Sequence, residues 1–148
     1  MTNIELKDLV GEHLFRFTPK TDLRHPIDAD AGGVMFGLDD VVYLIFEDPS
    51  DGYRSHAGPI LAFKGDAYQL GGSYHEYIHD QRVICSHETK GQYGDAADML
   101  CVRSAKTGEV IFRVGTNNVD DYYPYFVVEW FPQALDANQA AQTQQPSG

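Results

Sequence analysis

The sequence predicts an α+β domain built mainly from an antiparallel β-sheet, with one or two short helices. Short stretches rich in Val, Ile, Phe and Tyr recur along the chain, and residues typical of turns separate them. Helical spacing of apolar residues is clear only over residues 3–11. A length of 148 residues suits one domain. We therefore predict a single compact domain over residues 1–131 and a disordered tail over residues 132–148.

The first thirty residues predict a helix, a strand and a long loop. Asn3 is a suitable N-cap for a helix over residues 3–11, and Gly11 is a suitable end. Residues 13–18 then alternate in the manner of a β-strand. Residues 19–32 are rich in Pro, Asp, Gly and Ala, which favours a loop.

A hairpin follows in the middle of the chain. Residues 33–36 and 41–46 are its predicted strands, and residues 37–40 are the connection between them. The second strand is apolar on both faces, so we expect it inside the sheet and covered. Residues 59–64 and 82–86 predict two further strands.

The most distinct hairpin lies near the C-terminal end. Its strands are predicted at residues 98–104 and 109–114, and Gly108 provides the positive φ that the connecting turn requires. Residues 125–131 predict the last strand. The tail over residues 132–148 is dominated by Gln and Ala and has little to bury, which is typical of disorder.

The net charge of −11 excludes some classes of function. A protein that binds the phosphate backbone of nucleic acid needs a cationic stripe, and this chain has none, so we expect no direct nucleic-acid contact. No apolar run approaches the roughly 20 residues of a membrane span. Cys85 and Cys101 lie in apolar stretches, as buried free thiols do, and the N-terminus lacks the pattern of a signal peptide. These features predict a cytoplasmic protein.

Two acidic, tyrosine-bearing turns over residues 47–55 and 115–126 are the best candidates for a binding surface. Turn formation needs only Gly, Pro, Asn and Asp, so the added aromatic and Arg side chains favour contact with a partner. Pro49 interrupts the ligand spacing of a calcium loop, so Asx turns are the favoured interpretation of the acids. The residues Tyr122–Phe126 are an alternative homodimer contact. The candidate partner-binding residues are Asp48, Asp51, Tyr53, Arg54, Asp120, Asp121, Tyr122 and Tyr123.

A zinc site is the main alternative chemistry. His75, Glu76 and His79 match the pattern H-E-x-x-H, in which a helix places two His ligands on one face and the Glu acts as a base. His87 is a possible third ligand. However, Ser73 and Glu76 have the spacing of a capping box, which would turn the Glu towards the helix N-terminus. The sequence therefore favours no cofactor, with zinc bound by His75, His79 and His87 as the alternative.

At the two acidic turns, and at the hairpin between them that contains Thr107–Val110, the chain resembles a family of small phage- and prophage-encoded proteins of unknown function. The motifs that carry the resemblance are E-D-P-x-D-G-Y-R-S and G-T-x-N-x-D-D-Y-Y-P-Y-F, and the similarity extends over about residues 6–131. His56 replaces an aromatic residue expected there. The resemblance brings no catalytic residues. It implies a viral accessory protein that acts in the cytoplasm of a bacterial host.

Three functions remain open from the sequence. The leading hypothesis is a non-catalytic protein that binds and inhibits a host or defence protein through a basic surface of that target, in the manner of an anti-CRISPR protein or another counter-defence inhibitor. The second is a zinc-dependent hydrolase built on the H-E-x-x-H motif. The third is a small-ligand protein that binds or sequesters nucleotides in a pocket containing Arg54 and tyrosines.

Overall fold

The computed structural model describes residues 2–25, 31–47, 57–64, 78–90, 96–117 and 126–135. Ten β-strands and two 3-10 helices make up this part of the chain. The strands are β1 (Thr2–Ile4), β2 (Gly11–Phe17), β3 (Lys20–Arg24), β4 (Gly32–Leu38), β5 (Val41–Glu47), β6 (Ala57–Lys64), β7 (Ile78–Lys90), β8 (Ala96–Ser104), β9 (Val110–Thr116) and β10 (Phe126–Trp130). The 3-10 helices are η1 (Leu6–Leu9) and η3 (Pro132–Ala134).

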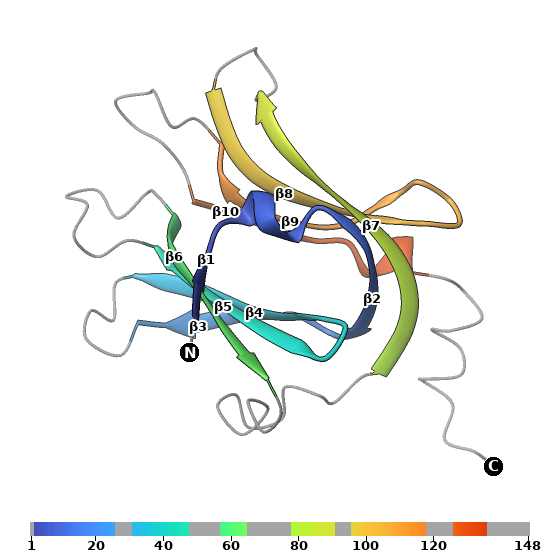
Figure 1. Cartoon of the computed structure of the whole chain (residues 1–148), viewed down its shortest axis with the longest axis horizontal. Helices are drawn as coiled ribbons and strands as arrows, with labels where there is room; N and C mark the ends of the chain where they lie inside the picture. Colours follow the sequence, from blue (N-terminus) through green and yellow to red (C-terminus); the bar gives the residue numbers. More distant parts are fainter. Residues whose placement is uncertain are drawn as a thin grey trace.

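All ten strands belong to one antiparallel sheet. The strand order is β1-β6-β5-β4-β2-β7-β8-β9-β10, and β3 pairs with β4 beside this path. The sheet bends sharply along β2 and β7, so that β4, β5 and β6 form one layer and β8, β9 and β10 form the other (Figure 1). The prediction of a mainly antiparallel β-sheet is therefore confirmed.

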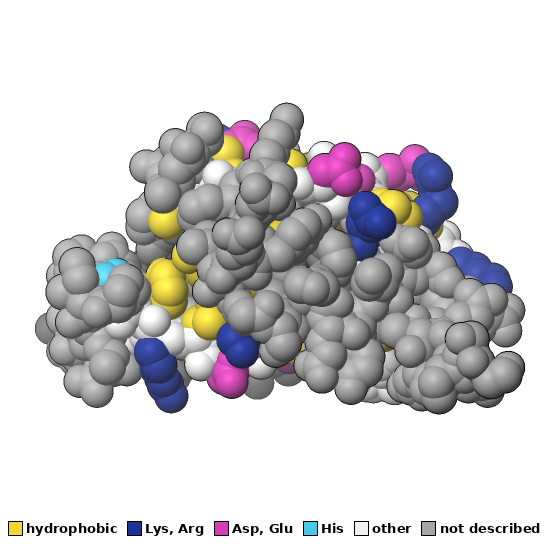
Figure 2. Space-filling view, turned by 90° about the horizontal axis from the view of Figure 1, so that it is seen from below, with side chains coloured by type: hydrophobic (Ala, Val, Ile, Leu, Met, Phe, Trp, Pro, Cys, Tyr) yellow, Lys and Arg dark blue, Asp and Glu magenta, His cyan; other side chains and the backbone are white. Residues whose placement is uncertain are grey.

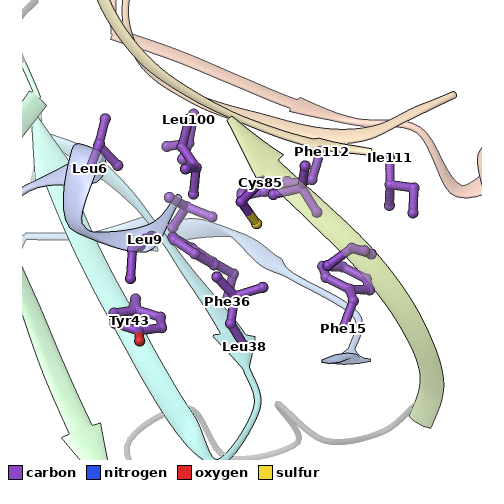
Figure 3. Close-up of a cluster of buried hydrophobic side chains, with 14 of the residues drawn as sticks. Leu6, Leu9, Phe15, Phe36, Leu38, Tyr43, Cys85, Leu100, Ile111 and Phe112 are labelled. Carbon is purple, nitrogen blue, oxygen red and sulfur yellow. The ribbon is translucent and has the colours of Figure 1, made fainter. Parts of the chain in front are cut away.

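Apolar side chains from both layers meet between them and form the core. The rings of Phe36 on β4 and Phe112 on β9 lie 5.1 Å apart, and Phe15 on β2 stacks on Trp130 of β10 at 5.8 Å. Figure 3 shows Phe15, Phe36 and Phe112 together with η1, whose buried residues Leu6 and Leu9 cover one side of the core. The core thus joins strands from opposite halves of the sheet.

Both predicted hairpins are confirmed. β4 and β5 pair from Gly33↔Phe46 to Leu38↔Val41, and β5 lies inside the sheet between β4 and β6, as its apolar sequence predicted. β8 and β9 form the second hairpin, and Gly108 has the expected positive φ of 79°.

The predicted helix over residues 3–11 is wrong. Residues 2–4 form β1, which pairs with β6 at the edge of the sheet, and only Leu6–Leu9 turn into the 3-10 helix η1. Pairing with a neighbouring strand satisfies the backbone of Asn3 in a way that the helical spacing of apolar residues does not reveal. The α part of the predicted α+β fold is thus reduced to 3-10 turns in the described residues.

Two other boundaries also differ from the prediction. Residues 19–32 were expected to form a loop but contain β3, an edge strand of sequence KTDLR that lacks the apolar run expected of a strand. The predicted disordered tail begins with η3, where Ala134 is buried and Leu135 packs against the core. Residues 136–148 lie outside the described residues. Within the described ranges, no helix has the length and hydropathy required to span a bilayer.

Candidate functional site

The predicted binding residues lie in two segments between strands. Residues 48–56 connect β5 to β6, and residues 118–125 connect β9 to β10. The strand ends that flank both segments lie in the left half of Figure 1, whereas the β4–β5 and β8–β9 turns lie in the right half. The side chains of Asp48, Asp51, Tyr53, Arg54, Asp120, Asp121, Tyr122 and Tyr123 are outside the described residues.

Negative charge exceeds positive charge along the chain. The sequence has 22 Asp and Glu residues against 11 Lys and Arg residues, a formal charge of −11. We use the term acidic segments for the two predicted turns, residues 47–55 and 115–126, which together contain five Asp and Glu residues and one Arg, a formal charge of −4. On the face shown in Figure 2, described Lys and Arg side chains lie among Asp and Glu side chains.

A cluster of charged side chains joins β7, β9 and β10. The Arg113 guanidinium donates from Nε and Nη2 to the Glu88 carboxylate, at 2.9 and 3.1 Å, and from Nη1 to Glu129 Oε1 at 2.9 Å. All three side chains are half-buried. They lie on the face of the sheet opposite the core, because Phe112 and Val114 on either side of Arg113 point into the core.

This ion cluster has a structural role and one uncompensated negative charge. Burial by itself lowers the pKa of Arg113, but the hydrogen bond and charge of Glu88, together with the charge of Glu129, raise it. The guanidinium is therefore engaged by the two carboxylates and has no free pair of N–H groups with which to bind a phosphate or nucleotide. Two carboxylates share one cation, so the net charge of the cluster is −1.

A second cluster connects η1, β2 and the β4–β5 turn. The His13 ring lies 2.7 Å from Asp39 Oδ2 through Nδ1 and 2.8 Å from the Leu9 carbonyl oxygen through Nε2. The Leu14 N–H donates to Asp39 Oδ1 at 2.9 Å. Partial burial alone would raise the pKa of Asp39, but the hydrogen bonds from His13 and Leu14 lower it. These contacts hold the turn against the start of β2.

Neither cysteine is an activated nucleophile. Cys85 lies opposite Val102 on the core face, whereas Cys101 lies opposite Ser86 on the other face, so the two thiols point to opposite sides of the sheet and form no disulfide. Burial raises the pKa of the Cys85 thiol to about 12. Burial also raises the pKa of Cys101. Both thiols therefore stay protonated at neutral pH, in agreement with their prediction as small hydrophobic residues.

The alternative zinc site lies largely outside the described residues. A helix that extends to His79 is not formed, because Ile78 and His79 already belong to β7. His87 lies eight residues further along this strand.

His87 is instead bound to a carboxylate. Its Nε2 lies 2.7 Å from Asp98 Oδ1 on β8. Among the described residues, no group of three or more His, Cys, Asp and Glu side chains is arranged to hold a metal ion. His75 and Glu76 lie outside these residues.

The ion cluster was not predicted from the sequence, although the strands that form it carry a signal for it. Arg113 and Glu129 each interrupt an otherwise apolar strand, in Ile111-Phe112-Arg113-Val114 and Val127-Val128-Glu129-Trp130. A charge at such a position requires a partner on a neighbouring strand. The sequence alone does not reveal which strand is the neighbour.

Comparisons with known proteins identify no relative. Neither the family models nor the curated proteins nor the solved structures contain a match to this chain.

Proposed function

We propose that this chain is a non-catalytic binding protein, encoded by a phage or mobile element, that inhibits a host or defence protein by covering a basic surface on it. The observation that carries the proposal is the net charge of −11, together with the two acidic segments that also carry tyrosines. A second support is that the flanking strand ends of β5, β6, β9 and β10 lie towards the same side of the molecule (Figure 1).

The chemistry of these segments suits protein recognition. A concentrated negative field attracts a basic surface, speeds the encounter and disfavours acidic partners. Asp48, Asp51, Asp120 and Asp121 would form salt bridges or replace the phosphates of a nucleic acid on the target. The neighbouring tyrosines would contribute apolar contact area, as tyrosine does at many interfaces. Such a protein would act in the cytoplasm of the bacterial host and would contact neither nucleic acid nor a membrane directly.

Capture of partners from bacterial lysate tests this function. The tagged full-length chain is incubated with lysate at low and high salt, and bound proteins are identified by mass spectrometry. We expect a basic protein in stoichiometric amount, lost at high salt because screening weakens exposed charge pairs. Capture should disappear when Asp48, Asp51, Asp120 and Asp121 are all changed to Asn.

A control variant separates local charge from total charge. Changing Glu12→Gln, Asp22→Asn, Asp40→Asn and Glu109→Gln also moves the net charge from −11 to −7, but on exposed positions of the described strands and turns. This variant should retain most of the capture. Equal loss in both variants would contradict the proposed surface, and an unchanged capture in the first variant would contradict it as well.

A further inference from the structure

The edges of the sheet differ in how well they are protected against another strand. In the described part of the chain, β1, β3 and β10 each pair on one side only. β1 has three residues, and β3 carries Lys20, Asp22 and Arg24, the kind of charged edge that discourages pairing. β10 has the sequence FVVEW, and its single charge, Glu129, is already engaged by Arg113. All five residues of β10 are half-exposed. β10 is thus the edge best suited to accept a strand.

The register of β9 and β10 determines which backbone groups of β10 point away from the sheet. Glu129 pairs with Arg113, and two residues later the Phe131 N–H donates to the Ile111 carbonyl oxygen at 2.8 Å. In an antiparallel ladder, hydrogen-bonded pairs recur at every second residue, so residues 127 and 129 bond to β9. Val128 therefore directs its N–H and C=O away from β9. Phe126 has the same orientation as Val128.

The charge beside this edge identifies the kind of strand that fits. A residue added opposite Glu129 would belong to a non-hydrogen-bonded pair, in which side chains approach most closely, with Cα atoms about 4.5 Å apart. It would lie on the same face as the ion cluster of Glu88, Arg113 and Glu129, whose net charge is −1. A Lys or Arg at that position would provide the second carboxylate with a cation of its own.

A second copy of the chain is a poorer fit. Antiparallel self-pairing centred on Val128 would place Val127 of the other copy opposite Glu129, and self-pairing centred on Glu129 would oppose two carboxylates. Neither register supplies a cation, and both bring together chains that each carry −11.

We propose that β10 accepts an extended segment of a basic protein as an additional antiparallel strand, with a Lys or Arg of that segment facing Glu129. Backbone hydrogen bonds at Val128 and Phe126 would provide the attachment, and the ion cluster would select for the cation. This inference rests on the proposed function, because it specifies how the basic partner is bound.

Two matched peptides test the inference on the full-length protein. Each has seven residues of alternating threonine and valine, with a central lysine in one and a central glutamate in the other. Amide hydrogen exchange is followed by NMR with millimolar peptide at low salt. We expect the lysine peptide to slow exchange of the Val128 amide at least tenfold, and added salt to reverse the effect. The glutamate peptide should have little effect. Equal protection by both peptides, or by neither, would overturn the inference.

Variants of β10 distinguish strand addition from contact with a side chain. Val128→Pro removes an N–H that β9 does not use, and an edge strand tolerates proline when the N–H faces solvent. It should abolish binding of the lysine peptide, whereas Val128→Ala should retain it. Glu129→Gln should weaken binding several-fold and reduce its dependence on salt. Binding that survives Val128→Pro would overturn the inference, as would concentration-dependent protection of Val128 without peptide, since a second copy would then occupy the edge.

The same proline variant separates the inference from the proposed function. A partner captured from lysate that binds Val128→Pro undiminished, yet is lost from the variant with four Asn substitutions, would leave the function standing and refute strand addition. Conversely, peptide binding at β10 without any captured basic protein would support the strand acceptor and count against the proposed function.

Discussion

Asp39 combines an unusual backbone conformation with a fixed side chain. Its φ of 57° is in the left-handed region, which Asp and Asn tolerate better than most residues. Its carboxylate accepts hydrogen bonds from the Leu14 N–H and from His13. One residue thus shapes the β4–β5 turn and joins it to β2.

The charge of Asp39 should make stability depend on acid pH. The pKa of Asp39 lies below its ordinary value of 3.8, so the unfolded chain binds the proton more readily. Its contribution to the free energy of unfolding is complete above about pH 4 and is lost as the pH falls through the folded-state pKa. Asp39→Asn should cost about 1 kcal/mol at pH 7, a value suited to a half-exposed charged hydrogen bond.

Urea unfolding of both proteins at pH 7 and pH 3 measures this effect. Asn preserves the tolerance of a positive φ, so the variant isolates the charge from the backbone conformation. The difference in unfolding free energy should shrink at pH 3. A difference that is the same at both pH values would show that the charge of Asp39 contributes nothing.

The buried thiols should be almost inert in the folded protein. With a pKa of about 12, the Cys85 thiolate fraction at pH 8 is on the order of a thousandfold below that of an ordinary cysteine. Titration with a thiol reagent should therefore detect neither Cys85 nor Cys101 rapidly in native protein, and both in 6–8 M urea, roughly the range in which small domains unfold. Rapid modification of Cys101 alone would show that its face of the sheet opens readily.

At the level of the elements, Gly115 is required by the close approach of two strands. Its φ is +148°, and a Cβ at this position would collide with the backbone of β8 at the Asp98 carbonyl. Gly115 is opposite Met99 on β8 and Val127 on β10, so displacement there disturbs three strands.

Gly115→Ala should lower the free energy of unfolding by about 3 kcal/mol or more, which combines backbone strain with overpacking. Gly11→Ala is a suitable control, because Gly11 also has a positive φ, of +130°, but nothing lies within 4 Å of its Cβ position. The control should lose only the cost of strain, about 1–2 kcal/mol. The free energy of unfolding of both variants is measured with denaturant. Equal losses for Gly115→Ala and Gly11→Ala would indicate that backbone strain alone, without the collision, explains the need for glycine at position 115.

The elements also show where local sequence was informative. The β4–β5 and β8–β9 hairpins were predictable because turn residues and apolar periodicity occur within a few positions of each other. β1 and β3 were not predictable in this way. Their partners are β6 and β4, and a short or charged edge strand is recognisable only once the neighbour is known.

For the whole molecule, stability depends on the contact between the two halves of the sheet. Phe36 and Phe112 are fully buried and meet at 5.1 Å across the core. Phe36→Ala should cost about 3–5 kcal/mol. This is a large part of the roughly 5–15 kcal/mol that stabilises a typical domain.

Phe46→Ala provides the comparison for this substitution. Phe46 lies on β5, is only partly buried and contacts the His25 ring at 5.2 Å. Phe46→Ala should lower the free energy of unfolding by less than half as much as Phe36→Ala. Less apolar surface is exposed, and no contact between the two halves of the sheet is removed. Urea midpoints of the two variants measure the difference. Similar losses would mean that the two halves of the sheet are not held together mainly through Phe36.

The sequence by itself determined that the fold is mainly an antiparallel β-sheet, and it determined both local hairpins, the buried character of the cysteines and the acidity of the chain. These properties depend on composition and on residues near one another in the chain. Only the tertiary structure decided that the sheet bends along β2 and β7, that Arg113 joins Glu88 to Glu129, and that β10 is an edge. Each of these depends on which strands are neighbours, and pairing between distant segments is set by packing of the whole core, which no local pattern encodes.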